Sequence, residues 1–156
     1  RDALAWAGYA ACMWAFVFAA VSFYWAAGGA AGVDTLGSTI TRLPGIVALL
    51  WVTGALKVLG GLLALSLARP WGRMPPRRLL LTLSWAGGVG MGVYGGIPLI
   101  INGLMVAGVL HVAGDVDWTA MRWHVFLWDP WWLIGGLLFS LAAWSYQHRS
   151  RPATSG

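Results

Sequence analysis

Glutamate is absent from this 156-residue sequence, and its five acidic residues are all aspartates. Charged residues of both signs make up only 10% of the chain, whereas a soluble domain is about 25% charged. A soluble protein of this size cannot cover its surface with so few charges. Because 59% of the residues are hydrophobic, we conclude that most of the surface faces lipid.

Cysteine is equally scarce, and the familiar catalytic signatures are missing. Cys12 stands alone in an apolar run, so it cannot form an internal disulfide, and we expect a small buried side chain. The sequence has no Walker loop, nucleophile elbow or dinucleotide-binding fingerprint. His111 and His124 do not follow the spacing of a zinc site, and no cysteine supplements them. We therefore expect neither a metal nor a cofactor.

Four long apolar stretches predict transmembrane helices, because a helix needs about 20 apolar residues to cross about 30 Å of hydrocarbon. The stretches are continuously apolar and do not alternate, which favours helices over barrel strands. The first is longer than the apolar core of a signal peptide, so we expect it to span the membrane. The stretches are Leu4–Ala27, Leu43–Ala68, Leu79–Leu110 and Pro130–Tyr146. The predicted fold is an all-α membrane protein, with one four-helix bundle over 1–147 and a short polar tail at 148–156.

Arginine placement orients the four spans. The connection between the second and third spans holds four arginines, and the C-terminal tail adds Arg149 and Arg151. The other two connections, 28–42 and 111–129, hold one arginine each and four of the five aspartates. Arginine-rich connections stay in the cytoplasm, so we predict an N-in/C-in topology in a bacterial cytoplasmic membrane. The net charge of +5 therefore reflects orientation, and we expect no nucleic-acid partner.

Lys57 is the one charged residue inside a predicted span. A lysine at the centre of a transmembrane helix costs about 2.5–3.5 kcal/mol, so such a residue is a functional candidate. Since no aspartate falls within a predicted span, Lys57 needs water, carbonyl groups, or an acid from a ligand or another subunit. We expect its amine to face the bundle interior, opposite the third span. Snorkelling or a polar contact within the bundle is the structural alternative.

The third span combines small residues with a proline. Glycines recur every four residues from Gly88 to Gly96, a pattern typical of close helix contact. Pro98 removes a helical donor and frees the carbonyl of Tyr94, so we predict a broken helix near mid-membrane, with Asn102 one turn further out. A broken helix facing a buried cation is one way of building a site inside a membrane. The alternative is a kink that serves packing alone.

The predicted outer connection, 111–129, concentrates aromatic and titratable side chains. Because large aromatic rings prefer burial, we expect this connection to fold back as an ordered lid over the outer end of the bundle. Within it, Met121–Phe126 is predicted to form a short interfacial helix. Asp129 followed by Pro130 is typical of a helix start, so we expect Asp129 to cap the fourth span. The alternative role for Asp129 is that of an acid in an aromatic pocket.

Together these observations define a candidate ligand-binding set around a pocket in the membrane. Its members are polar or aromatic residues in or just outside the predicted spans. They are Lys57, Tyr94, Pro98, Asn102, Trp123, His124, Trp128 and Asp129.

Two motifs resemble those of a known family. The segment Met121-Arg-Trp-His-Val-Phe-Leu-Trp-Asp-Pro-Trp-Trp132, followed by a Gly-Gly pair, is similar to a motif in a bacterial family of small membrane proteins of unknown function. Tyr24-Trp-Ala-Ala-Gly-Gly29 resembles the motif that closes that family's first helix, although Ser22 and Phe23 stand where a histidine is expected. The resemblance covers about residues 5–147. It implies four spans and assigns no role to any residue.

Two functions fit the sequence. The first is a midplane pocket for a hydrophobic ligand, such as a lipid or an isoprenoid, entered from the outer half of the membrane. The second is a non-enzymatic accessory subunit or small transporter component, whose glycine stripe contacts another copy or a partner membrane subunit. Whether the protein is an enzyme is left open. Membrane lipids are the expected surroundings in both cases.

The topology prediction can be tested by cysteine labelling. With Cys12 replaced by alanine, a cysteine at Ser38 should react with an impermeant thiol reagent added from outside. A cysteine at Ser150, in the tail, should react only from the cytoplasmic side and serves as the control. Labelling of the Ser38 position from the cytoplasmic side alone would contradict the N-in/C-in arrangement.

Overall fold

The computed structural model describes residue 4 and residues 6–69 and 76–149. In these ranges the chain is all-helical, and four helical stretches are long and apolar enough to cross a membrane. They are α1 (Trp6–Ala26), α3 (Ile46–Ala68), α4 (Arg77–Val106) and a composite helix over Trp118–Arg149. Two short helices, η1 (Val33–Leu36) and α2 (Ser38–Thr41), lie between α1 and α3. The predicted class, a multi-pass protein with four apolar helices, is confirmed.

The surface of the bundle is as apolar as its interior. Large aliphatic side chains on α3 and α4 point outward, and Leu56, Leu59 and Val89 are 59%, 61% and 55% exposed. Such exposure is unfavourable in water, but lipid chains are as apolar as these residues. The backbone of each helix meets its own hydrogen bonds, which lipid cannot provide. The outward-facing residues therefore form a surface for the membrane.

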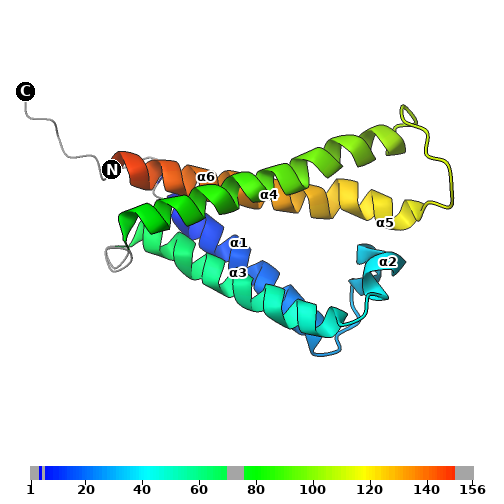
Figure 1. The fold of residues 1–156 in the computed structure, drawn as a ribbon, viewed down its shortest axis with the longest axis horizontal. Helices are drawn as coiled ribbons and strands as arrows, with labels where there is room; N and C mark the ends of the chain where they lie inside the picture. Colours follow the sequence, from blue (N-terminus) through cyan, green and yellow to red (C-terminus); the bar gives the residue numbers. More distant parts are fainter. Residues whose placement is uncertain (1–3, 5, 70–75, 150–156) are drawn as a thin grey trace, which may run out of the picture.

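The helices form two antiparallel pairs. The α1 helix packs most extensively on α3, and α4 packs most extensively on α6 (Asp129–Arg149), the last part of the composite helix. The pairs meet chiefly through α1 and α6, whereas α3 and α4 share few contacts. Figure 1 shows the pairs diverging toward the end that carries α2, here called the loop end. The other end, where α1 begins and α6 ends, is the terminal end.

Glycines set the close approach of α4 and α6. A Cβ added to Gly136 of α6 would lie 2.4 Å from the Gly92 nitrogen and 2.7 Å from the Gly88 carbonyl oxygen of α4. A Cβ on Gly95 would lie 2.5 Å from the carbonyl oxygen of Asp129. The glycine stripe predicted for close helix contact is thus used inside the chain. Gly95 takes part in place of the expected Gly96, whose added Cβ would meet only Leu133 at 3.7 Å.

The α4 helix runs without interruption through Pro98, so the predicted break is wrong. A proline removes one backbone donor, but in lipid every further unmade hydrogen bond costs several kcal/mol, which favours keeping the helix intact on both sides. At 30 residues and a rise of about 1.5 Å per residue, α4 exceeds the hydrocarbon thickness. Such a helix fits a bilayer by tilting or by extending beyond it.

The fourth span begins twelve residues earlier than predicted, at Trp118, and not at Pro130. It consists of α5 (Trp118–Trp123), a π-helical turn η3 (His124–Trp128) and α6. The helix predicted at Met121–Phe126 is therefore part of a continuous span, and 118–128 do not fold back as a lid. A proline ring clashes with the carbonyl four residues earlier in an α-helix. The wider π turn just before Pro130 relieves this conflict.

Asp129 does not cap the span, because it lies inside the helix with φ −64° and ψ −47°. The residue that caps it is Asp117, whose side chain accepts a hydrogen bond of 3.0 Å from the Ala120 nitrogen. The Asp-Pro pair signals a helix start only when no helix precedes it. Here α5 and η3 directly precede the pair.

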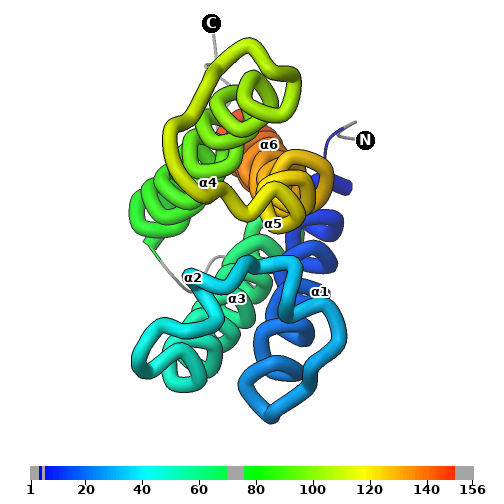
Figure 2. The backbone as a smooth tube through the Cα atoms, turned by 90° about the vertical axis from the view of Figure 1, so that its right-hand side faces the viewer, coloured from blue at the N-terminus to red at the C-terminus, as the bar shows by residue number. Residues whose placement is uncertain are grey.

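The first connection closes the loop end. Figure 2 shows the segment with η1 and α2 crossing the space between the α1–α3 pair and α5. The contact is close, because a Cβ on Gly37 would lie 3.1 Å from the Ala120 Cβ. Gly37 also has φ +88°, which L side chains rarely adopt, so glycine is needed there for conformation as well as space.

We expect Gly136→Ala to lower the free energy of unfolding by about 1–3 kcal/mol, because its methyl group would push α4 and α6 apart. Gly87→Ala is the matched control, since an added Cβ there meets nothing within 4 Å. Its effect should be neutral or stabilising by about 0.5–1 kcal/mol. Thermal unfolding of the detergent-solubilised proteins measures both. Equal midpoints for the two variants would contradict the assigned packing.

Candidate functional site

Lys57 reaches from α3 into the bundle. Its Nζ donates a hydrogen bond of 2.7 Å to Ser22 Oγ of α1 and lies 3.9 Å from the centre of the Phe18 ring. The Trp132 ring of α6 is 6.0 Å away. A cation over an aromatic face is attracted by the ring quadrupole. The amine therefore faces inward, as expected, but its direct contacts come from α1 and α6 and not from the third span.

In the described part of the chain, the Lys57 cation has a hydrogen-bond acceptor but no counter-ion. Ser22 is buried, and its hydroxyl donates to the Phe18 carbonyl at 3.1 Å, which leaves the oxygen lone pairs free to accept from Lys57. Among residues 6–69 and 76–149, no carboxylate lies within ion-pair distance of Lys57. Buried charges in proteins are normally paired or coordinate a metal ion, whereas the half-buried Lys57 has a hydroxyl and aromatic rings as its neighbours.

Two cavities meet at Lys57, and Thr53, Lys57 and Trp132 line both of them. The larger has a volume of about 320 Å³ and lies between α3 and α4, which share few contacts. We call it the apolar cavity, and its other walls include Trp14, Leu56, Gly60, Met91 and Phe139. The smaller, about 160 Å³, lies nearer the loop end. We call it the histidine cavity, and its other walls include Ser22, Trp25, Tyr94, His124 and Trp128.

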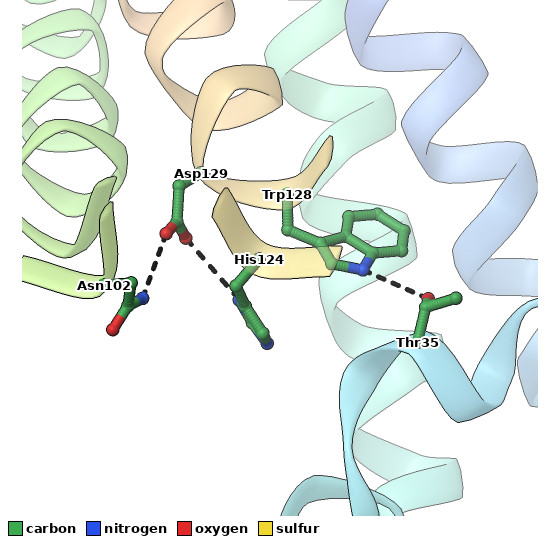
Figure 3. Close-up of polar contacts among 5 residues, drawn as sticks. All are labelled: Thr35, Asn102, His124, Trp128 and Asp129. Atoms are coloured by element: carbon green, nitrogen blue, oxygen red, sulfur yellow. Dashed lines mark hydrogen bonds and ion pairs between the residues drawn. The ribbon is translucent and has the colours of Figure 1, made fainter. Parts of the chain in front are cut away.

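Asp129 forms the centre of a second polar group, which adjoins the histidine cavity through His124. Its carboxylate accepts a hydrogen bond of 3.1 Å from Asn102 Nδ2 of α4, and its other oxygen lies 3.5 Å from His124 Nδ1 (Figure 3). Asp129 is only 4% exposed. The expectation that every aspartate lies outside the membrane-spanning helices is therefore wrong for this residue. Its side-chain partners are an amide and an imidazole, and it lines neither cavity, so the alternative role, an acid in an aromatic pocket, stays a prediction.

The π turn brings His124 beneath Asp129. Residues five apart lie on different faces of an α-helix. A π turn is closed by bonds between residues five apart, here from the Asp129 N–H to the His124 carbonyl, and aligns the two side chains. Single π turns are common at functional sites. The pairing of His124 with Asp129 thus depends on this local departure from α-helical geometry.

Trp128 ties the fourth span to the first connection. Its Nε1 donates a hydrogen bond of 3.1 Å to Thr35 Oγ1 of η1, as Figure 3 shows. The Thr35 hydroxyl in turn donates to the Gly32 carbonyl at 2.6 Å. The Trp128 ring also stacks on Phe18, with 6.1 Å between ring centres. A hydrogen bond therefore joins the fourth span to the first connection at Trp128, which lines the histidine cavity.

The structure brings most of the predicted site residues together. Lys57, Tyr94, His124 and Trp128 line the histidine cavity. Asp129 contacts His124, and Asn102 donates to Asp129, but neither of these two lines a cavity at Lys57. Trp123 is 44% exposed and lines neither cavity, and Pro98 lines neither. No group of three or more His, Cys, Asp or Glu suited to a metal ion occurs in the described part of the chain.

Sequence reasoning missed three residues of the site, Ser22, Thr35 and Trp132. The first carried a usable signal, because a hydroxyl in a transmembrane helix tends to find a partner on a neighbouring helix. The other two had none. Thr35 sits in a connection, and Trp132 belongs to a run of tryptophans that reads as an interfacial belt.

We expect Lys57→Met to leave the free energy of unfolding unchanged or to raise it by about 1–3 kcal/mol, because an apolar side chain removes the desolvation cost of the cation. Leu59→Met is the control for side-chain shape, since Leu59 is 61% exposed on the same helix. Thermal unfolding in detergent gives both values. Marked destabilisation by Lys57→Met alone would show that the cation holds the helices together.

The comparison with known families agrees with the two motifs found in the sequence. A family model described as Protein of unknown function (DUF3995) matches residues 15–139, which include both motif-bearing segments. No curated protein and no solved structure matches the chain. The match covers more than half of the sequence. The chain therefore belongs to the DUF3995 family, whose function is unknown.

Proposed function

We propose that this protein binds an amphipathic ligand whose acidic head group pairs with Lys57 and whose apolar chain occupies the apolar cavity. The observation that carries the proposal is the position of Lys57. A half-buried cation with a hydroxyl and an aromatic face as its neighbours stands at the junction of two cavities, without a carboxylate partner in the described chain. An anionic ligand supplies the missing charge.

The shape of the two cavities supports an amphiphile over a small polar anion. The walls of the apolar cavity are hydrocarbon and aromatic rings apart from Thr53 and Lys57. The polar atoms gather at its junction with the histidine cavity. A ligand with one acidic end and one apolar end matches this division, because each part then meets groups of its own kind. Fatty acids and lipid or isoprenoid phosphates share that chemistry.

We further propose that both termini are cytoplasmic and that the loop end faces outward in a bacterial cytoplasmic membrane. The described arginines Arg69, Arg77 and Arg149 gather at the terminal end, where Arg149 donates to the Leu67 carbonyl at 2.8 Å. Arginine-rich ends stay in the cytoplasm. The histidine cavity then lies toward the outer leaflet, and the wall made by η1 and α2 with α5 is the structured outer region.

The glycine stripe of α4 gives the accessory-subunit alternative less support than it gave from the sequence. It rested on the glycine stripe of α4 as a contact for another chain. In the structure Gly88, Gly92 and Gly95 already pack against α6 of the same chain. A partner subunit would have to bind elsewhere, and the cavity at Lys57 would still need an explanation. The pocket is therefore the function that the geometry favours.

Photolabelling tests the proposal directly. A fatty acid with a diazirine in its chain, and the matching fatty alcohol, are added to the purified protein in non-ionic detergent. The acid should label residues around the apolar cavity, such as Met91, and Lys57→Met should reduce this labelling about tenfold, the effect of losing about 1.4 kcal/mol of binding energy. Leu59→Met should label like the parent, and the alcohol should label weakly throughout. Equal labelling by acid and alcohol, or full labelling of Lys57→Met, would refute the proposal.

A further inference from the structure

The apolar cavity extends from the interior of the bundle to its lipid-facing surface. Its inner wall includes the buried side chains of Trp14 and Phe139. Its outer wall includes Leu56 of α3, which is exposed on the surface of the bundle. A cavity whose walls pass from buried to exposed residues has an opening. Because α3 and α4 share few contacts, and residues of both line the cavity, the opening lies between these two helices.

Two half-buried glycines line this cavity from opposite helices, Gly60 of α3 and Gly87 of α4. A Cβ added to Gly87 would meet nothing within 4 Å, and one added to Gly60 would meet only the Phe139 ring, at 3.8 Å. In the described part of the chain, neither helix therefore packs against the glycine of the other. A larger side chain at Gly87 would extend into open space between α3 and α4.

The direction of the two helices places these glycines on the same side of the cavity. The α3 helix ends, and α4 begins, at the terminal end of the bundle. Gly60 lies about one turn beyond Lys57 in that direction, and Gly87 lies about one turn beyond Met91. A hydrocarbon chain that extends from Lys57 toward the terminal end therefore passes between the two glycines.

The volume of the cavity limits how much of a chain it can enclose. A water molecule occupies about 30 Å³ of the liquid, and a methylene group is of similar size. A cavity of about 320 Å³ therefore holds about ten carbon atoms. The acyl and isoprenoid chains of membrane lipids are longer than this. A closed cavity of this size would exclude them, whereas an open one lets the rest of the chain lie in the bilayer.

We propose that the gap between α3 and α4 is a lateral opening to the bilayer, kept open by Gly87, through which the chain of the bound ligand extends into lipid. This inference rests on the proposed acidic ligand at Lys57. The whole chain then stays in a hydrocarbon environment, so none of its apolar surface is exposed to water. The site therefore takes long-chain acids as well as short ones, without an upper limit of chain length.

Competition between acids of different length tests the opening. Octanoic acid that carries a diazirine labels the purified protein in non-ionic detergent, and unlabelled octanoic or octadecanoic acid competes with it. Both acids should compete in the parent. Gly87→Leu should weaken competition by octadecanoic acid about tenfold, and competition by octanoic acid less than about twofold, because only the longer chain needs the opening. Comparing each variant with the parent for the same acid cancels partitioning of that acid into detergent.

Gly90→Leu is the matched control. Gly90 lies on the same helix, lines neither cavity, and has nothing within 4 Å of an added Cβ. Both substitutions add the same side chain in open space, so both variants should keep the thermal unfolding midpoint of the parent. Competition by the two acids in Gly90→Leu should match the parent, which separates closure of the opening from a general effect of a leucine on α4.

The outcomes distinguish this inference from the proposed function. Absence of labelling in the parent, or full labelling of Lys57→Met, would refute the ligand site and the opening with it. Labelling that depends on Lys57, without competition by octadecanoic acid in the parent, would leave the site in place and show that the cavity is closed. An equal effect of Gly87→Leu on the two acids, whether small or large, would also overturn the opening.

Discussion

Lipid offers no hydrogen bonds and little screening of charge, and this constraint governs the whole molecule. Backbone groups must be satisfied within each helix, which is why α4 continues through Pro98 and why the fourth span reaches Pro130 by a π turn without ending. Polar side chains must lie in the interior of the bundle, where other polar side chains can be their hydrogen-bond partners. Lys57 meets Ser22, and Asp129 meets Asn102 and His124. The same physics that shapes the helices therefore concentrates the polar groups in one place.

The packing of the helices determines where these polar groups lie. Glycines draw α4 and α6 into backbone contact, and α1 and α3 approach through small residues such as Gly8, whose added Cβ would lie 2.8 Å from the Ala68 Cβ. Nothing comparable joins α3 to α4. Two tight pairs that meet along α1 and α6 leave space between the other two helices, and aromatic rings fill it incompletely. The cavities beside Lys57 thus follow from an uneven distribution of small residues.

The sequence predicts the spans well because continuous apolarity is a strong signal that needs no tertiary information. It also points to Lys57, since a charge in an apolar run is visible without a structure. The sequence gives wrong predictions at Pro98 and Pro130. A proline signals the end or a break of a helix only when the surrounding medium can satisfy the freed backbone groups. The wrong prediction for Asp129 has the same cause. Read as a cap, it belongs at the membrane surface, whereas a continuous helix places it inside the bundle.

The partnership between His124 and Asp129 lies beyond sequence reasoning for a different reason. They are five positions apart in the sequence, a spacing that neither an α-helical nor a strand pattern pairs. Only the π turn aligns them, and a π turn is less favourable than an α-helical one, so something in its surroundings must stabilise it. Pro130 supplies part of that stabilisation, because its ring disfavours an α-helical turn there. Trp128, held by Thr35, supplies another part on the opposite face. A local backbone irregularity, fixed from two sides, therefore brings an acid and an imidazole together beside one of the two cavities that Lys57 lines.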